Sequence, residues 1–250
     1  TAYDISLGLV GSEMCIRDSD RPLVGVTCGI RESSFAKWTM DAAILPSTYT
    51  SAIERAGGIP LLIPPSDFST SILDKINAIV IAGGPDIDPS EYGQEPYSSK
   101  ASYYPKQDSS ESALIQGALD RDMPMLCVCR GMQLLSIIHG GKLYQHLDDT
   151  PGFEGHGSYD GQSSEHIVNT IDGSKISSLM GSQMIVNSTH HQGVSDAGSL
   201  IVTAHADHDG LIEAVERPDL KFCIGVQWHP ERMGKNHDIL YSELIKSARS

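Results

Sequence analysis

The sequence Pro124-Met125-Leu126-Cys127-Val128-Cys129-Arg130-Gly131-Met132-Gln133 joins a short apolar run to a helix-like run that continues to Ile138. This pattern predicts a buried strand, a tight turn at Cys129 and a helix. A thiol in that turn lies at the positive end of a helix dipole, which favours the thiolate. The alternative is that Cys129 is a buried small hydrophobic residue, as free cysteines usually are.

Strand and helix patterns alternate on both sides of this stretch. Apolar runs predict strands over residues 23–27, 59–63, 78–82 and 125–128. The helix patterns between them are one capped by Ser47 and ended by Gly57-Gly58, a short one over 69–75, and one that ends near Arg121 after a capping box of Asp108 and Glu111. Such alternation predicts a parallel sheet covered by helices on both faces, and hence an α/β fold.

The pattern changes after about residue 160, where strands and turns follow one another. Strands are expected over 166–171, 184–187, 200–206, 211–216 and 222–228, and Asn236 is a candidate cap for a last helix over 239–248. No linker or repeat interrupts residues 20–250, so we expect one domain there. Residues 7–19 resemble translated sequencing-adapter text and not a secretion signal. We therefore expect residues 1–19, with Cys15, to be non-native.

Composition limits the partners of this chain of 250 residues. Its net charge is −14 and it has no basic run, which argues against a nucleic-acid partner. No apolar run approaches the roughly 20 residues that a membrane helix requires. Five scattered cysteines favour a reducing compartment over a disulfide framework, so we expect a cytoplasmic protein. The oligomeric state stays open, a homodimer included.

Three segments follow the carboxyl ends of predicted strands, where ligands bind in an open parallel sheet. They are Gly83-Gly84, Cys129 and Gln227-Trp228-His229-Pro230-Glu231. A thiol nucleophile needs a base, and the base needs an orienting group; His229 and Glu231 suit these two roles. The backbone N–H groups of Arg130 and Gly84 are candidate donors to an oxyanion. Taken singly, each segment is equally well explained as an ordinary turn.

Together these segments resemble the class I glutamine amidotransferase fold. Further motifs narrow the resemblance to its γ-glutamyl-γ-aminobutyrate hydrolase branch, the peptidase C26-like family. These motifs are Ala56-Gly57-Gly58-Ile59-Pro60, Asp86-Ile87-Asp88-Pro89 with Tyr92-Gly93, Val186-Asn187-Ser188-Thr189-His190-His191-Gln192 and Asp209-Gly210-Leu211-Ile212-Glu213-Ala214-Val215-Glu216. The resemblance runs from about Pro22 to the last helix and implies a flavodoxin-like three-layer sandwich with a central, mostly parallel sheet.

The resemblance also implies a role for each matching residue. Cys129 would be the nucleophile, His229 the base and Glu231 its orienter, while Gly84 and Arg130 would supply oxyanion N–H groups. The residues implied to bind substrate are Gln133, at the glutamyl head group, with Ser188, His190 and Gln192. The implied reaction is hydrolysis of a small γ-glutamyl amide through a glutamyl-thioester, which releases glutamate and an amine, as in polyamine catabolism. No metal or organic cofactor is implied.

The sequence departs from the family pattern at three places. Cys127 adds a second thiol, which we expect to be structural; Gln107-Asp108 stands where an Arg-Asp pair is usual; and His191 replaces a residue that is often Gly. Two other functions stay open: a glutaminase subunit that supplies ammonia to a separate synthetase, and a binding or regulatory protein. The leaving amine is also open. Loops 29–46 and 97–106 are expected to read it, and the first is long enough to act as a lid.

The remaining cysteines and histidines receive structural interpretations. Cys28 and Cys223 sit in strand-like runs and are expected in the core. His166 is expected to be structural or to border the active site. The sequence His205-Ala206-Asp207-His208-Asp209 has the residue types of a metal site. Closed sites need three or four converging ligands, so a solvated turn is the preferred interpretation.

Overall fold

The computed structural model describes residues 21–96, 102–153, 155–157 and 163–249. Residues 1–19, with Cys15, and residues 97–101 of the second predicted amine-reading loop lie outside this range. Within the described residues, none of the helices combines the length and the apolarity that a membrane span requires.

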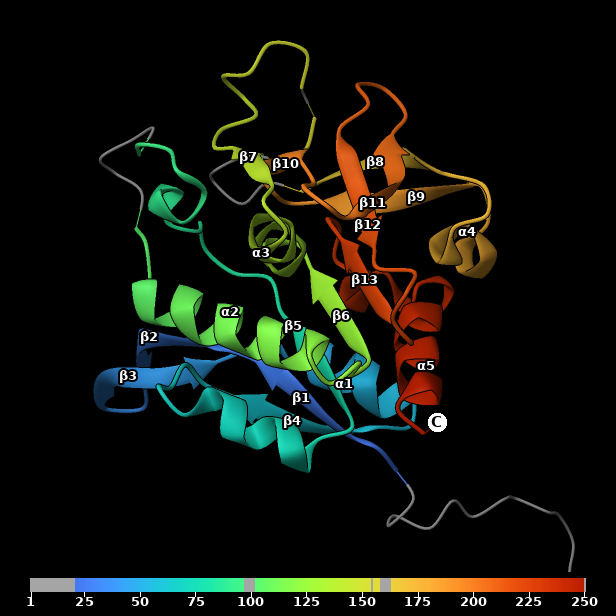
Figure 1. The fold of residues 1–250 in the computed structure, drawn as a ribbon. Coiled ribbons are helices and arrows are strands. Elements are labelled where there is room, and N and C mark those ends of the chain that lie inside the picture. The colour runs from blue at the N-terminus through green and yellow to red at the C-terminus, as the bar shows by residue number, and fades with distance from the viewer. Residues whose placement is uncertain (1–20, 97–101, 154, 158–162, 250) are drawn as a thin grey trace, which may run out of the picture.

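The described strands form one mixed sheet of 11 strands and one separate hairpin (Figure 1). The order in the large sheet is β4-β1-β5-β6-β13-β12-β11-β8-β9, and β10 pairs with β12 and β7. Its strands are β1 (Leu23–Thr27), β4 (Ile59–Ile63), β5 (Ala78–Ile81), β6 (Met125–Val128), β7 (Lys142–Tyr144), β8 (Ser164–Thr170), β9 (Gln183–Ser188), β10 (Gly193–Asp196), β11 (Ile201–Ala206), β12 (Ile212–Glu216) and β13 (Cys223–Val226). The five neighbouring strands β4, β1, β5, β6 and β13 run parallel to one another. All other strand pairs in this sheet are antiparallel.

Helices cover both faces of the parallel strands (Figure 1). The helices are α1 (Ser47–Arg55), α2 (Pro105–Leu119), α3 (Arg130–Ile138), α4 (Lys175–Met180) and α5 (Asp238–Ser247), with short 3-10 helices η2 (Ser69–Lys75), η3 (Pro89–Tyr92), η4 (Pro230–Arg232) and η5 (Gly234–Asn236). In β6, Leu126 and Val128 pack in the core with α1 and α5, whereas Met125 and Cys127 pack in the core with α2 and α3. The predicted α/β sandwich with a central, mostly parallel sheet is confirmed.

The segment 29–46, predicted to be a loop, forms the separate β-hairpin. β2 (Gly29–Phe35) pairs antiparallel with β3 (Trp38–Ile44). The residues of both strands are exposed or half-buried, so no apolar alternation marks them in the sequence. Strands β7 and β10 and helix α4 were not predicted either, because their three to six residues, several of them polar or glycine, form no apolar run.

Three predicted helix caps are wrong. Asp108 and Glu111 lie inside α2, because Pro105 has a backbone suited to the first helical position and begins the helix earlier. Ser47 is the first residue of α1 and not its cap. The N-cap of α5 is His237, while Asn236 belongs to the preceding 3-10 turn. Asp108 and Glu111 do not cap α2 but form ion pairs with the buried Arg130.

The cysteines expected in the core are buried. Cys28, Cys127 and Cys223 are free thiols with at most 3% of their surface exposed. Burial raises the pKa of Cys127 well above its usual value, with Cys223 adding to the effect. Cys127 is therefore held as a neutral thiol away from the edge of the sheet where Cys129 lies.

Candidate active site

Cys129 occupies a strained turn between β6 and α3. Its φ is +52° and its ψ is −109°, a conformation that costs a residue other than glycine about 1–3 kcal/mol. Its N–H donates to Val226 O at 2.7 Å, which fixes the turn against β13. Gly131 follows because a Cβ at that position would overlap Ile81 O. The Cys-Arg-Gly sequence thus lets α3 approach β5 and sets the thiol at the amino end of the helix.

The His229 ring is oriented by a carboxylate. Its Nδ1 lies 2.8 Å from Oε1 of Glu231, which is only 4% exposed. Pro230 separates the two residues and opens the 3-10 turn η4, which carries Glu231 back toward the ring. Because Nδ1 faces Glu231, Nε2 is the ring nitrogen left for the thiol.

Gly83, just beyond β5, brings the thiol and the imidazole together. A Cβ on Gly83 would lie 2.7 Å from His229 Cε1, so only glycine leaves the imidazole in place, and it would contact Cys129 Cβ at 3.5 Å. The Gly83 N–H donates to the Tyr49 hydroxyl at 2.9 Å, and that hydroxyl lies 3.4 Å from His229 Nδ1. The structure therefore brings the three sequence segments to one point at the carboxyl edge of the parallel strands.

The charges around His229 favour the protonated imidazole. Burial alone would lower the pKa of His229, but the negative charge of Cys129, a hydrogen bond to its sulfur and the Glu231 carboxylate together raise it to about 10. Burial, and then the Glu231 charge, raise the pKa of Tyr49 well above its usual value, so its hydroxyl stays neutral. The site thus holds a protonated imidazole between the Cys129 sulfur and the Glu231 carboxylate.

The Arg130 side chain is buried and forms ion pairs with Asp108 and Glu111 of α2. Burial raises the pKa of Asp108, and Arg130 offsets part of that rise. A Cβ on Gly84 would lie 3.0 Å from Arg130 Cδ, so the two residues with candidate oxyanion donors are adjacent. Arg130 is also the first residue of α3, so its N–H has no carbonyl partner within the helix.

Gln107, which departs from the family pattern, links this ion-pair network to the hairpin. Its Nε2 donates to Glu111 Oε1 at 2.9 Å, and its Oε1 accepts from Arg31 at 2.7 Å. The Arg31 guanidinium also lies 3.6 Å above the centre of the Tyr104 ring. Gln107 does not supply the positive charge of the usual arginine. Its hydrogen bond with Arg31 connects β2 to α2.

Gln133 is buried within hydrogen-bonding distance of Gln192 and Gln227. Its Nε2 lies 3.1 Å from Gln192 O and 3.2 Å from Gln227 Oε1. Gln227 in turn places its Nε2 3.5 Å from Cys129 Sγ. Gln133 thus orients Gln227, and Gln227 contacts the sulfur.

The other three predicted substrate residues bond to backbone carbonyls. Ser188 Oγ donates to His156 O at 2.8 Å, His190 Nδ1 to Gln192 O at 2.8 Å, and Gln192 Nε2 to Gln145 O at 3.2 Å. These side chains are buried at 5% exposure or less, so they support the surrounding backbone and are not open to solvent.

A cavity of about 450 Å³ lies beside His229, within the range of small-molecule sites. The described residues that line it come from the hairpin, α1, the turn after β5, α2 and the His229 segment: Gly29, Arg31, Ile44, Pro46, Thr48, Tyr49, Gly83, Gly84, Pro85, Gln107, His229, Glu231 and Arg232. Gln133, Ser188, His190 and Gln192 are not among them. The segment predicted to act as a lid supplies one wall of this cavity.

Three contributors escaped the sequence analysis. Gln227 precedes His229 by two residues, and this strand-like spacing could have placed both on one face. Asn187 hydrogen-bonds the His229 backbone twice, but nothing in its position marks that role. Tyr49 shares a helix face with the core residues Ala52 and Ile53, so its pattern predicts only burial.

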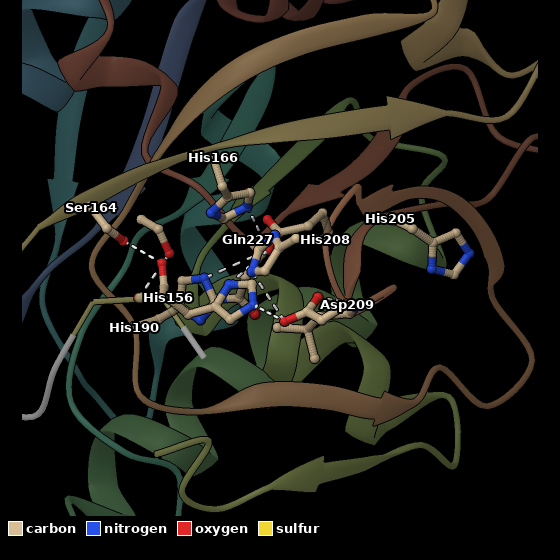
Figure 2. Close-up of polar contacts among 12 residues, drawn as sticks. His156, Ser164, His166, His190, His205, His208, Asp209 and Gln227 are labelled. Atoms are coloured by element: carbon tan, nitrogen blue, oxygen red, sulfur yellow. Dashed lines mark hydrogen bonds and ion pairs between the residues drawn. The ribbon is translucent and has the colours of Figure 1, made fainter. Parts of the chain in front are cut away.

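A second cluster of titratable side chains includes His156, His166, His190, His208 and Asp209 (Figure 2). His156 groups with His208 and Asp209, and also with His166 and Glu213, closely enough to share a metal ion. His205 points away from the cluster and bonds Gly210 O at 2.9 Å (Figure 2). The predicted turn 205–209 is thus divided: Asp209 is buried against His156, whereas His208 borders the cluster on its solvent side. His191 pairs instead with Asp86, at 2.8 Å.

Comparison with known proteins places this geometry in a family. A Mycobacterium tuberculosis protein provisionally named as a glutamine amidotransferase, Rv2859c, is 39% identical over 86% of this chain and 71% of its own length. The γ-glutamyl-γ-aminobutyrate hydrolase PuuD of Escherichia coli K12 is 31% identical over 85% of this chain and 86% of its own. The glutaminase domain of Trypanosoma brucei CTPS, solved with acivicin, matches 91% of this chain and 93% of its own with a TM-score of 0.64 and 15% identity, which shows a common fold.

The sequence pattern of the Peptidase C26 family matches residues 22–231, a span that holds Gly84, Cys129, His229 and Glu231. This chain therefore belongs to the Peptidase C26 family, within the class I glutamine amidotransferase-like proteins, which act as hydrolases on amides.

Proposed function

We propose that this protein is a cysteine-dependent hydrolase of γ-glutamyl amides. The observation that carries the proposal is the line formed by Glu231, His229 and Cys129, with the thiol in a strained turn. Each group then has a separate role. The thiol attacks, the imidazole moves the proton, and the carboxylate keeps the ring in position.

In the first half of the reaction, Cys129 Sγ attacks the γ-carbonyl carbon and the carbonyl oxygen takes the negative charge. The N–H groups of Arg130 and Gly84, two residues that lie side by side, would stabilise that oxyanion. His229 Nε2 gives its proton to the leaving amine, the C–N bond breaks, and a glutamyl-thioester remains. In the second half, water gives a proton to His229, attacks the thioester and releases glutamate, and the thiolate is restored.

We further propose that the leaving amine carries a carboxylate. Two arginines, Arg31 and Arg232, line the cavity beside the imidazole, and their positive charges would attract such a group. The name of the E. coli relative, γ-glutamyl-γ-aminobutyrate hydrolase, describes a substrate of this kind. A glutaminase subunit that feeds a synthetase would need no such cations at the amine side.

The decisive experiment compares Cys129→Ala with Cys127→Ala on a panel of γ-glutamyl amides. We expect Cys129→Ala to lose turnover by at least about 10³-fold, because the covalent step is removed. Cys127→Ala should keep most of its turnover, since this thiol is fully buried among apolar residues. Turnover retained in Cys129→Ala would refute the mechanism. Hydrolysis of glutamine alone, rising sharply with an added synthetase, would favour the ammonia-supplying alternative.

A further inference from the structure

Four segments meet in the histidine–carboxylate cluster (Figure 2). His156 comes from the loop before β8, His166 from β8, His190 from the β9–β10 connection, and Glu213 from β12. The side chains of all four are at most 6% exposed. None of these groups takes part in the mechanism above.

The Glu213 carboxylate is the centre of the cluster. Its Oε1 lies 3.2 Å from His166 Nε2, 3.5 Å from His156 Nδ1 and 3.8 Å from His190 Nε2. Despite these distances, both Glu213 oxygens and all three nitrogens lack a hydrogen-bond partner among the described residues. Burying a carboxylate without partners is costly, so the arrangement calls for a cation between these atoms.

The spacing of these atoms matches a metal site better than a hydrogen-bond network. Donor and acceptor in an N–H···O bond are usually 2.7–3.2 Å apart. Zinc ligands at about 2.0–2.2 Å from the metal in a tetrahedron are about 3.3–3.6 Å from one another. The three distances around Glu213 Oε1 bracket that value. His156, His166 and Glu213 also place one ligand atom each within 4.8 Å of one another.

The hydrogen bonds on the far side of two of the imidazole rings also support a metal site. His156 Nε2 lies 2.7 Å from Asp209 Oδ2, and His190 Nδ1 lies 2.8 Å from Gln192 O. A histidine that binds a metal commonly donates its other N–H to a carboxylate or a backbone carbonyl. Each contact turns the remaining nitrogen, His156 Nδ1 or His190 Nε2, toward Glu213.

We propose that His156 Nδ1, His166 Nε2 and Glu213 bind a divalent transition-metal ion of the zinc type, with His190 Nε2 beside the Glu213 ligand at 3.8 Å. Imidazole ligands select zinc and its neighbours over calcium and magnesium, which prefer oxygen. His208, with 39% of its side chain exposed and its Nε2 3.3 Å from Asp209 Oδ2, marks the side open to solvent.

The proposed metal site would support the structure next to the active site. The proposal does not depend on the reaction proposed above. The metal would fix Glu213 and, through it, the neighbouring His190, whose Nδ1 bonds the carbonyl of Gln192; that carbonyl also accepts from Gln133. It would also join the His156 loop to the sheet. The sequence contains no compact metal-binding motif for this site, because its ligands are spread over 58 positions, from 156 to 213.

The test uses the full chain with Cys129→Ser, so that the thiol cannot bind the probe. Zn²⁺ is titrated by calorimetry after treatment with a chelator, and the retained metal is measured by mass spectrometry. We expect one Zn²⁺ per chain. Glu213→Gln and His166→Gln in the same background should weaken binding at least about tenfold. His205→Ala, which changes a half-buried histidine of the same region outside the cluster, should bind Zn²⁺ as before.

A spectroscopic measurement covers the case in which the ligand variants fail to fold. Co²⁺ added to the Cys129→Ser protein should give the strong visible absorption of a tetrahedral site with nitrogen and oxygen ligands. Absence of Zn²⁺ binding and of this absorption would overturn the proposal, since the cluster would then be a network of protein groups alone. Equal Zn²⁺ affinity in the Glu213→Gln and His166→Gln chains would overturn it as well.

Discussion

The side-chain amide of Asn187 holds the backbone of His229 at both ends: Oδ1 accepts from the His229 N–H at 2.9 Å, and Nδ2 donates to the His229 carbonyl at 3.0 Å. Asn187 is in β9, at the far edge of the sheet in strand order, whereas His229 follows β13 in the parallel half. The antiparallel extension of the sheet therefore positions the base of the proposed triad. Because Asn187 accepts one of these hydrogen bonds and donates the other, it fixes both the position and the orientation of the His229 backbone.

Asn187→Ala is expected to lower kcat about 100-fold with little change in KM, because a displaced imidazole affects the chemical step more than binding. Steady-state kinetics on a chromogenic γ-glutamyl anilide measure both parameters. Asn169→Ala is the matched control, since Asn169 bonds Asp207 on an exposed part of β8. An increase in KM with an unchanged kcat would assign Asn187 to substrate binding instead.

The pKa of His229, raised to about 10, predicts the alkaline limit of activity. A proton that the folded state holds more tightly stabilises it fully below the ordinary imidazole pKa of about 6.5, and this contribution is lost as pH rises through about 10. We therefore expect kcat/KM to fall on the alkaline side near pH 10, and the stability advantage over His229→Gln to shrink over the same window. pH–rate profiles and denaturant titrations at several pH values measure the two effects.

Glu231→Gln provides the control for this pH dependence. Removing the carboxylate removes one of the groups that raise the pKa of His229, so the alkaline limb should move to lower pH. An alkaline limb that stays in place in Glu231→Gln would mean that another group sets it.

Arg130→Met tests the buried ion pairs with Asp108 and Glu111. Without the guanidinium, two carboxylates stay buried and uncompensated, so the free energy of unfolding should fall by about 3–5 kcal/mol. Arg55→Met removes an ion pair with Asp238 at a more exposed site and should cost about 1 kcal/mol or less. Urea titration of the two variants gives the comparison. Equal losses would show that the Arg130 pairs contribute no more than surface pairs.

The sequence predicted the parts of this protein that depend on local pattern. The apolar run before Cys129 marks a buried strand, and the carboxyl ends of parallel strands meet at one edge, so Gly83, Cys129 and His229 could be expected near one another. The spacing of His229 and Glu231 requires only a short turn between them. These inferences need no knowledge of long-range contacts.

The remainder depends on contacts between distant residues. Asp108 and Glu111 have the spacing of a capping box, and only the position of Arg130 in the fold reveals their other partner. The hairpin has exposed strands without apolar alternation, so its pairing leaves no pattern. The sequence around Glu213 predicts only an ordinary strand residue, and the histidines near it are apparent only in the folded structure.

A chain that begins at Asp20 should fold and act like the full chain. The family match starts at residue 22 and the first described strand at Leu23, so the proposed domain over 20–250 contains every residue of the proposed mechanism. We expect the melting temperature and kcat/KM to agree with those of the full chain within error. A large loss in either would show that residues 1–19 belong to the protein's working structure.

Arg31 offers the sharpest test of the leaving amine. Its guanidinium lines the cavity, fixed above the Tyr104 ring and against Gln107 Oε1. If it pairs with a carboxylate on the amine, Arg31→Gln should raise KM for γ-glutamyl-γ-aminobutyrate about tenfold, the value of one charged hydrogen bond. KM for γ-glutamyl methylamide, which has no carboxylate, should change less than about twofold, and this substrate serves as the internal control. Equal increases for both substrates would mean that Arg31 supports the hairpin wall and does not read the amine.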